Sequence, residues 1–178
     1  MNPISSEQVT LRDGTQVIIR PIQPDDAPRL QALLTRLSPE STYLRFLAIV
    51  KGLSDKEAQR LANVDYTTSM AIVATVVEDD EEQIIGVARY SSVDGDEPGL
   101  AEAAVVVEDR HQRRGLGSLL LKRLTAYARR HGVRKFLANI HPTNEAIMGF
   151  IRRSGLPIES QADAGVWQIR IVLEHDLA

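Results

Sequence analysis

The sequence contains no cysteine, and aromatic residues make up only 4% of its 178 residues. The absence of cysteine excludes a disulfide framework, a thiolate zinc site and a cysteine nucleophile. No run of 18 apolar residues occurs, so we expect no transmembrane helix. Residues 1–7 have neither the basic nor the apolar region of a signal peptide, and we therefore expect a soluble cytoplasmic protein.

Length and composition favour a single globular domain. Hydrophobic residues are 43% and charged residues 25% of the chain, which is enough apolar material for one core. No internal repeat, low-complexity stretch or long linker divides it. We expect one domain over residues 1–178, with its core at about 9–173.

Acidic residues are in slight excess, but the charges are unevenly distributed. The formal net charge is −3. Between Arg110 and Lys135 there are nine Lys or Arg and no Asp or Glu, which leaves 12 basic and 24 acidic residues elsewhere. A basic block in an otherwise acidic chain predicts an anionic partner.

Hydrophobic periodicity and turn residues predict an α/β fold with a mixed sheet. Runs rich in β-branched residues predict the strands, which are expected at 9–11, 16–20, 70–77, 84–90, 100–107, 136–140 and 166–173. Capping residues and apolar periodicity predict the helices, which are expected to begin at Pro24, Ser38, Ser54, Leu116 and Asn144.

The segment from Val105 to Gly117 is the most informative part of the sequence. A strand runs into a glycine-containing loop that becomes the first turn of a helix. At such a junction the unpaired main-chain N–H groups, here around residues 113–118, converge with the positive helix end and can bind phosphate. Gly115 and Gly117 let the backbone approach a ligand, and Arg113 and Arg114 add phosphate donors.

A chance occurrence of this glycine spacing is expected in roughly one chain of this length in ten. Its position between a strand and a periodic helix, inside the basic block, favours an anion site. A dinucleotide loop needs a third Gly where Leu120 stands, and the nucleotide-triphosphate loop G-x-x-x-x-G-K-[ST] is absent. The remaining ligand is a pyrophosphate bound without metal.

The run Gln112-Arg113-Arg114-Gly115-Leu116-Gly117 resembles the Q/R-x-x-G-x-G/A pyrophosphate loop of the GNAT superfamily of N-acetyltransferases. The resemblance implies a mixed, mostly antiparallel sheet flanked by helices, with acetyl-CoA as cosubstrate and no metal. In that family the strand before the loop pairs with the pantetheine arm of the cosubstrate. The residues that the resemblance assigns to acetyl-CoA are Val105, Val106, Val107, Gln112, Arg113, Arg114, Gly115, Leu116, Gly117, Ser118 and Asn144.

Short segments elsewhere are similar to the catalytic domain of bacterial Pat-type protein lysine acetyltransferases. They are 10–15, 19–22, 37–41, 43–46 and Ala101-Glu102. This resemblance implies that the acceptor is a lysine of a protein, such as an acyl-CoA synthetase, and that Glu102 is the general base. The chain has no room for the synthetase-like or cyclic-nucleotide domains often fused in that group, so we expect a free-standing catalytic unit.

Glu102 suits the role of base for a simple chemical reason. A lysine amine has a pKa near 10.4, so forming the neutral nucleophile at pH 7 costs about 4–5 kcal/mol. Glu102 lies in an apolar run, where partial burial would make it a better base, although strand alternation leaves a surface position equally open. Many family members place a Tyr acid seven residues after the Asn, but here that position is Ile151.

The sequence is also compatible with other functions. The acceptor could instead be a small amine or an antibiotic, or the domain could bind acyl-CoA or nucleic acid without catalysis. The small number of aromatic residues argues against a stacking platform for nucleic acid. The histidines have no metal-ligand spacing and are expected at ordinary surface positions; they are His111, His131, His141 and His175.

The segment around Tyr43 offers two interpretations. Tyr43, Arg45 and Phe46 could line an acceptor cleft. An aromatic pair three residues apart on a helix is more typical of a core. The spacing therefore favours the core.

Overall fold

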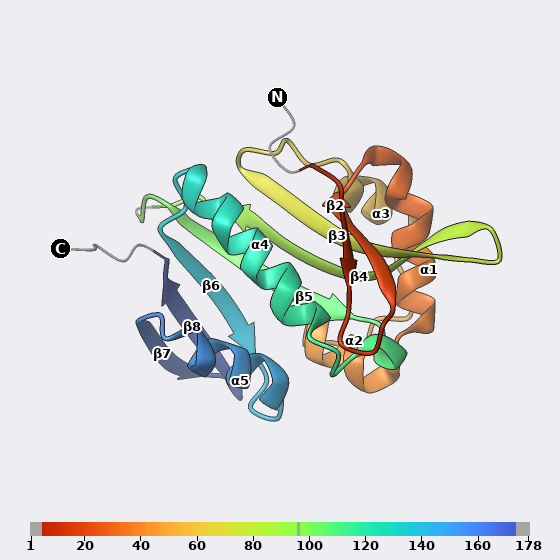
Figure 1. Ribbon diagram of the computed structural model, residues 1–178. Coiled ribbons are helices and arrows are strands. Elements are labelled where there is room, and N and C mark those ends of the chain that lie inside the picture. The colour runs from red at the N-terminus through yellow and green to blue at the C-terminus, as the bar shows by residue number, and fades with distance from the viewer. Residues whose placement is uncertain (1–4, 96, 174–178) are drawn as a thin grey trace.

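Eight strands form one mixed sheet in the computed structural model, which describes residues 5–95 and 97–173 (Figure 1). Their order across the sheet is β1-β2-β3-β4-β5-β6-β8-β7. The β5–β6 pair is parallel, and the other neighbouring pairs are antiparallel. The expected α/β class and mostly antiparallel sheet are confirmed. The strands are β1 (Glu7–Thr10), β2 (Gln16–Pro21), β3 (Ser69–Glu78), β4 (Glu81–Ser92), β5 (Leu100–Val107), β6 (Lys135–Ile140), β7 (Ile158–Asp163) and β8 (Val166–Val172).

Five α-helices and two short 3-10 helices flank this sheet in the described residues. They are η1 (Pro24–Asp26), α1 (Ala27–Arg36), α2 (Pro39–Phe46), α3 (Asp55–Ala62), η2 (Asp109–His111), α4 (Leu116–Arg130) and α5 (Glu145–Ser154). The expected caps are present: Ser38 and Ser54 accept hydrogen bonds from the first turns of α2 and α3. No helix within the described ranges has the length and the apolar character needed to span a membrane.

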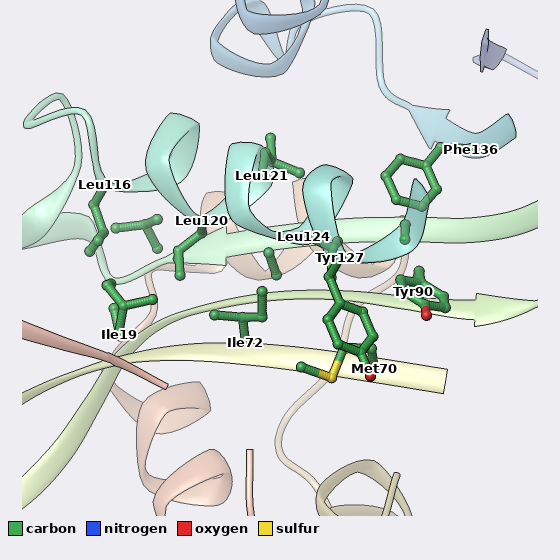
Figure 2. Close-up of a cluster of buried hydrophobic side chains, with 14 of the residues drawn as sticks. Ile19, Met70, Ile72, Tyr90, Leu116, Leu120, Leu121, Leu124, Tyr127 and Phe136 are labelled. Carbon is green, nitrogen blue, oxygen red and sulfur yellow. The ribbon is translucent and has the colours of Figure 1, made fainter. Parts of the chain in front are cut away.

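Helix α4 covers one face of the sheet through the apolar positions that the sequence period predicts. Leu116, Leu120 and Leu124 are fully buried. Figure 2 shows them directed toward side chains of the strands, among them Ile19 and Ile72. This packing fixes the start of α4 against the sheet, and so fixes the loop that precedes it.

Helices α1 and α3 pack on the opposite face. Leu30 and Leu33 of α1 and Ala58 of α3 are buried against strand residues such as Val73 and Val87. Helix α2 follows α1 directly and contacts β5. Helices therefore cover both faces of the sheet along much of β3, β4 and β5.

Strand β7 is an element that the sequence pattern does not predict. All six of its residues are exposed, and the sequence Ile-Glu-Ser-Gln-Ala-Asp has no apolar alternation. The strand exists because it pairs along its whole length with β8 at the edge of the sheet. Pairing of the main chain, which side-chain periodicity does not report, determines this element.

Asp26 is a buried carboxylate that ties β2 to the start of α1. Its side chain is 1% exposed, and Arg20 donates hydrogen bonds to its two oxygens at 2.7 and 2.8 Å. Burial alone would raise the pKa of Asp26. Hydrogen bonds from Arg20 and the Gln23 amide, with the charges of Arg20 and Arg29, outweigh burial and lower the pKa.

The variant Asp26→Asn should reduce the free energy of unfolding at pH 7 by about 3 kcal/mol, because it removes the charged partner of Arg20 Nη1 and Nη2 and leaves Glu82 as the remaining carboxylate on Arg20. The folded state lowers the pKa of Asp26. Ionised Asp26 therefore stabilises the fold above its unfolded pKa near 3.9, and this stabilisation is lost as the pH falls below that value. Urea unfolding at several pH values should show the difference between variant and wild type shrinking below about pH 4.

Asp25→Asn is the matched control, because Asp25 is exposed and makes no ion pair in the described structure. It should change the free energy of unfolding little at any pH. A difference between Asp26→Asn and wild type that stays constant from pH 7 to pH 3 would contradict the role given to the Asp26 carboxylate.

Candidate functional site

The loop between β5 and α4 has a backbone shape suited to an anion. After η2, Arg113 has φ +61° and Gly115 has φ +85°, so two left-handed residues flank Arg114. Alternation of left- and right-handed residues turns successive main-chain N–H groups toward the same side. The loop then enters α4, whose positive end adds to the attraction for an anion.

The main-chain N–H groups of residues 113–118 are unpaired in this part of the described structure. None of the six donates a hydrogen bond to a protein group. The amides on either side are paired: Gln112 donates to the Asp109 carbonyl at 3.2 Å and Leu119 donates to the Gly115 carbonyl at 3.0 Å. The unpaired amides therefore form one contiguous donor set at a helix start, as the sequence predicts.

The protein itself places little demand on Gly117. A Cβ built there would meet only Val107 Cγ2 at 3.6 Å, an ordinary van der Waals contact. Gly115, by contrast, is required by its positive φ, and a Cβ there would also face the Arg12 guanidinium at 3.7 Å. Open space beside Gly117 fits a ligand that approaches the backbone at the first turn of α4.

Two side chains predicted to contact the ligand are used within the protein. The Gln112 amide donates to the Val107 carbonyl at 2.9 Å and to Ser41 Oγ at 3.0 Å. Arg114 forms an ion pair with Asp13 of the β1–β2 turn. Arg113 has no such partner in the described residues and is exposed. Gln112 and Arg114 therefore hold the loop in place, and the main chain supplies the donors.

Strands β5 and β6 pair over three residues, Leu100–Glu102 with Lys135–Leu137, and then separate. β5 continues to Val107 and β6 to Ile140, but beyond this point the two strands do not pair with each other (Figure 1). The Gly99 carbonyl accepts a hydrogen bond from the Lys135 N–H of β6. The Leu100 carbonyl accepts one from the Val93 N–H, which directly follows β4 on the other side of β5.

The main-chain groups of β5 point alternately to its two neighbours, so odd-numbered residues face β6 and even-numbered residues face β4. Val105 lies beyond the last β5–β6 pair, so its N–H and C=O face the space between the strands without a sheet partner. The Val107 carbonyl on that side accepts from Gln112. The main chain of Val106 faces β4 instead. Of the three valines predicted to pair with a pantetheine arm, Val105 alone offers both groups.

A groove of about 550 Å³ joins the loop to this space. It passes over Gly117 and Ser118, along Val105 and against Asn144. It continues into an apolar cavity of about 80 Å³ between the separated strands, lined by Ala103, Ala104 and Phe136 among others. Residues that line both spaces are Leu44, Arg45, Val105, Leu121, Asn144, Ile147 and Phe150.

Asn144 begins α5 and lines the groove, but its side-chain oxygen caps the helix. Oδ1 accepts from the Ile147 N–H at 3.3 Å. The side-chain NH₂ group makes no hydrogen bond within the described structure. Ile151, where a Tyr acid is common in the GNAT superfamily, is buried on the same helix.

Glu102 is exposed, which corrects the partial burial expected from its apolar surroundings. The small neighbours Ala101 and Ala103 alternate away from it, and the face that carries Glu102 is open at this point. Glu102 makes no ion pair in the part of the chain described here, and Arg45 is a nearby positive charge. The carboxylate lies two residues before Ala104 on the same face of β5, so it is close to the inner end of the groove.

The structure also corrects the expectations for α2 and for His111. Tyr43 is 41% exposed, so it is not a core residue, and its ring contacts His141 edge-on at 5.6 Å. His111 is buried rather than at the surface, and burial lowers its pKa. His175 lies outside the described residues. No group of three His, Cys, Asp or Glu side chains within residues 5–95 and 97–173 could hold a metal ion.

Ion pairs with acidic residues from distant segments neutralise much of the basic block. Arg110 contacts Glu78, Arg123 contacts Glu7, and Lys135 contacts Glu97. These carboxylates bind Arg and Lys side chains that would otherwise be available to the phosphates of a nucleic acid. The basic block therefore gives little support to nucleic-acid binding.

Residues 38–156 match the model of the Acetyltransferase (GNAT) family. Acetyltransferase PA5475 of Pseudomonas aeruginosa is 37% identical over 138 residues, which cover 78% of this chain and 73% of that protein. Acetyltransferase Pat of Mycolicibacterium smegmatis is 31% identical over 147 residues, or 83% of this chain. The match spans only 43% of that longer relative.

Solved structures agree with these matches. The GNAT domain of S. lividans PAT has a TM-score of 0.82 and 32% identity, with 93% of this chain and 95% of that domain covered. An acetyltransferase of Salmonella typhimurium, solved with its cofactor acetyl-CoA, has a TM-score of 0.68 over 91% of this chain and 96% of its own. At 21% identity, that second structure shows the shared fold alone.

Substituting Gly117 should test the loop without disturbing the fold. Gly117→Val fills the open space at the first turn of α4, and we expect the affinity for coenzyme A, measured by calorimetry, to fall at least about tenfold as the diphosphate is pushed from the amides. Gly52→Val is the control, because a Cβ at Gly52 meets nothing within 4 Å and lies outside the groove. Unchanged affinity in a folded Gly117→Val protein would contradict this location for the diphosphate.

Proposed function

Because the chain belongs to the acetyltransferase (GNAT) family, we propose that it transfers the acetyl group of acetyl-CoA to the side-chain amine of a protein lysine. The contiguous set of unpaired amides at residues 113–118 is the observation that carries the proposal. In this proposal those amides bind the pyrophosphate of acetyl-CoA. The groove then leads the pantetheine arm past Val105 to the space between β5 and β6.

Main-chain pairing supports this direction for the arm. The pantetheine arm contains amide groups, and the N–H and C=O of Val105 lack a sheet partner on the side that faces the groove. An extended arm bound there acts as an added strand, since it restores the missing hydrogen bonds. Asn144 lies on the opposite wall with a free NH₂ group. The thioester then lies near Ala104, close to Glu102.

The chemical step needs a neutral amine and a leaving thiolate. The amine nitrogen attacks the thioester carbonyl carbon, a C–N bond forms, and the C–S bond breaks. Glu102 takes the proton of the amine, directly or through water, and its exposure lets both routes operate. No acid stands at Ile151, and the thiol of coenzyme A, with an ordinary pKa near 8.5, can leave as thiolate without one.

The choice of a protein lysine as acceptor rests on the Pat-type segments of the sequence and on two Pat relatives at 31% and 32% identity. The chain covers less than half of the Mycolicibacterium smegmatis relative, so the substrates and regulation of that longer protein are not carried over. The cytoplasm, expected from the sequence, is the compartment in which we propose this reaction.

The acceptor can be tested with purified acyl-CoA synthetases and a panel of small amines and antibiotics. With radiolabelled acetyl-CoA, we expect label on a synthetase lysine, located by mass spectrometry, and little turnover of the small amines. A kcat/KM for a small amine that exceeds the value for every protein would contradict the proposed acceptor. Absence of acetyl-CoA binding by the folded protein would contradict the whole proposal.

Glu102→Gln tests the proposed base. The variant keeps the shape of the side chain but cannot accept the proton, so kcat should fall about 100-fold or more while the affinity for acetyl-CoA stays within about twofold. Glu159→Gln on the exposed strand β7 is the control and should retain full activity. Unchanged turnover in Glu102→Gln would remove Glu102 from the mechanism.

A further inference from the structure

Two arginines stand out on the side of the sheet that carries Glu102. Arg45 of α2 and Arg89 of β4 are both half-buried and line one small apolar cavity of about 40 Å³. The other walls are hydrophobic, including Leu33, Leu61 and Val106. Placing two positive charges beside an apolar wall is costly unless each charge has a partner.

Neither arginine forms an ion pair in the described residues. Arg89 donates a single long hydrogen bond, from Nη1 to the Leu61 carbonyl at 3.4 Å. The Arg45 guanidinium lies 4.7 Å from the centre of the Phe46 ring. Most of the ten N–H donors on the two guanidinium groups are therefore free for another group.

The rest of the chain treats half-buried arginines differently. In residues 5–95 and 97–173, every half-buried arginine apart from Arg45 and Arg89 has a carboxylate partner, and the other arginines are exposed to water. The paired arginines are Arg20, Arg29, Arg36, Arg114, Arg123 and Arg170. Arg45 and Arg89 thus break a pattern that the fold otherwise follows.

The local electrostatics also favour an incoming anion. Burial lowers the pKa of Arg89 to about 10, and the charges of Arg45 and Arg60 add to this effect. Burial lowers the pKa of Arg45 as well, with Glu102 as the opposing charge. Arg45 and Arg60 therefore both repel the charge of Arg89, and a bound anion would relieve this repulsion.

The pair lies next to the reacting end of the groove. Arg89 is directly opposite Ala104 in the β4–β5 ladder, and the next pair on that face is Ser91 with Glu102. Arg45 lines both the apolar cavity near Arg89 and the inner end of the groove. A group held by both arginines would be within a few residues' length of the proposed thioester and base.

We propose that Arg45 and Arg89 form a carboxylate-binding subsite that selects an acceptor with an acidic group close to the reactive amine. This rests on the proposed function, since it concerns the acceptor of that reaction. In a protein substrate the acidic group is an Asp or Glu side chain next to the acetylated lysine. The same positive charges disfavour the protonated amine and so help to present it neutral.

An acyl donor with its own carboxylate, such as succinyl-CoA, offers the same chemistry. The structure favours the acceptor, because Arg89 lines only the cavity between β4 and the helices α1–α3, outside the groove proposed for the thioester. The inner cavity near Ala103 and Ala104 is small, and its walls are mostly apolar, as suits an acetyl group.

Two lysine peptides that differ by Asp or Asn beside the lysine test the subsite. Acetylation followed by mass spectrometry should give the Asp peptide about tenfold higher kcat/KM with the wild-type protein. Arg89→Met should abolish the preference, Arg89→Lys should retain part of it, and Arg89→Glu should reverse it toward a peptide with Lys in place of Asp. Arg130→Met, on the exposed last turn of α4, should leave it unchanged.

The outcomes separate this inference from the proposed function. Equal rates on both peptides, or a preference that survives Arg89→Met, would overturn the subsite and leave lysine acetylation standing. If neither peptide is acetylated, the protein-lysine proposal fails. The subsite is then tested on small acceptors, by comparing the kcat/KM for an amino acid with that for its carboxamide. The assignment to the acceptor would be overturned if the wild-type protein prefers succinyl-CoA to acetyl-CoA, Arg89→Met loses this preference, and the Asp of the peptide has no effect on the rate.

Discussion

The main-chain amides at residues 113–118 stay unpaired because the segments on both sides of them are held in place. Leu116 and Leu120 bury the start of α4 against the sheet. Gln112 ties the loop to the end of β5 and to α2. An unsatisfied set of donors is tolerated only where water or a ligand can reach it, and this loop opens into a groove. The proposed activity depends on this one feature.

The separation of β5 and β6 gives the groove its inner end. A parallel pair that stops at Leu137 leaves main-chain groups of Val105 exposed and opens a cavity in what would otherwise be a continuous sheet. The cavity extends the line from the loop toward Glu102. On the face of the sheet that carries Glu102, Arg45 and Arg89 bring positive charge without a carboxylate partner in the described residues close to the same point. The groove proposed for the donor and the subsite proposed for the acceptor thus meet where β5 and β6 separate.

The sequence predicts the elements whose signals are local. The period of Leu116, Leu120 and Leu124 identifies α4, and the glycine spacing with its flanking strand identifies the loop. β7 has no apolar pattern, since its pairing with β8 alone defines it. Strand alternation predicts which face of β5 carries Glu102, but it does not predict whether a helix covers that face. Arg114 forms an ion pair with Asp13, and Arg45 and Arg89 line one cavity. Both arrangements join segments far apart in sequence, so no local pattern predicts them.

An NMR titration of the ¹⁵N-labelled protein with coenzyme A tests the central claim most directly, because it observes the amides themselves. On saturation, the amide signals of residues 113–118 should show the largest shifts in the spectrum, with downfield proton shifts typical of hydrogen bonds to phosphate. Those of the paired amides of Gln112 and Leu119 should move less. Binding that shifts signals elsewhere and leaves those of residues 113–118 in place would contradict the account.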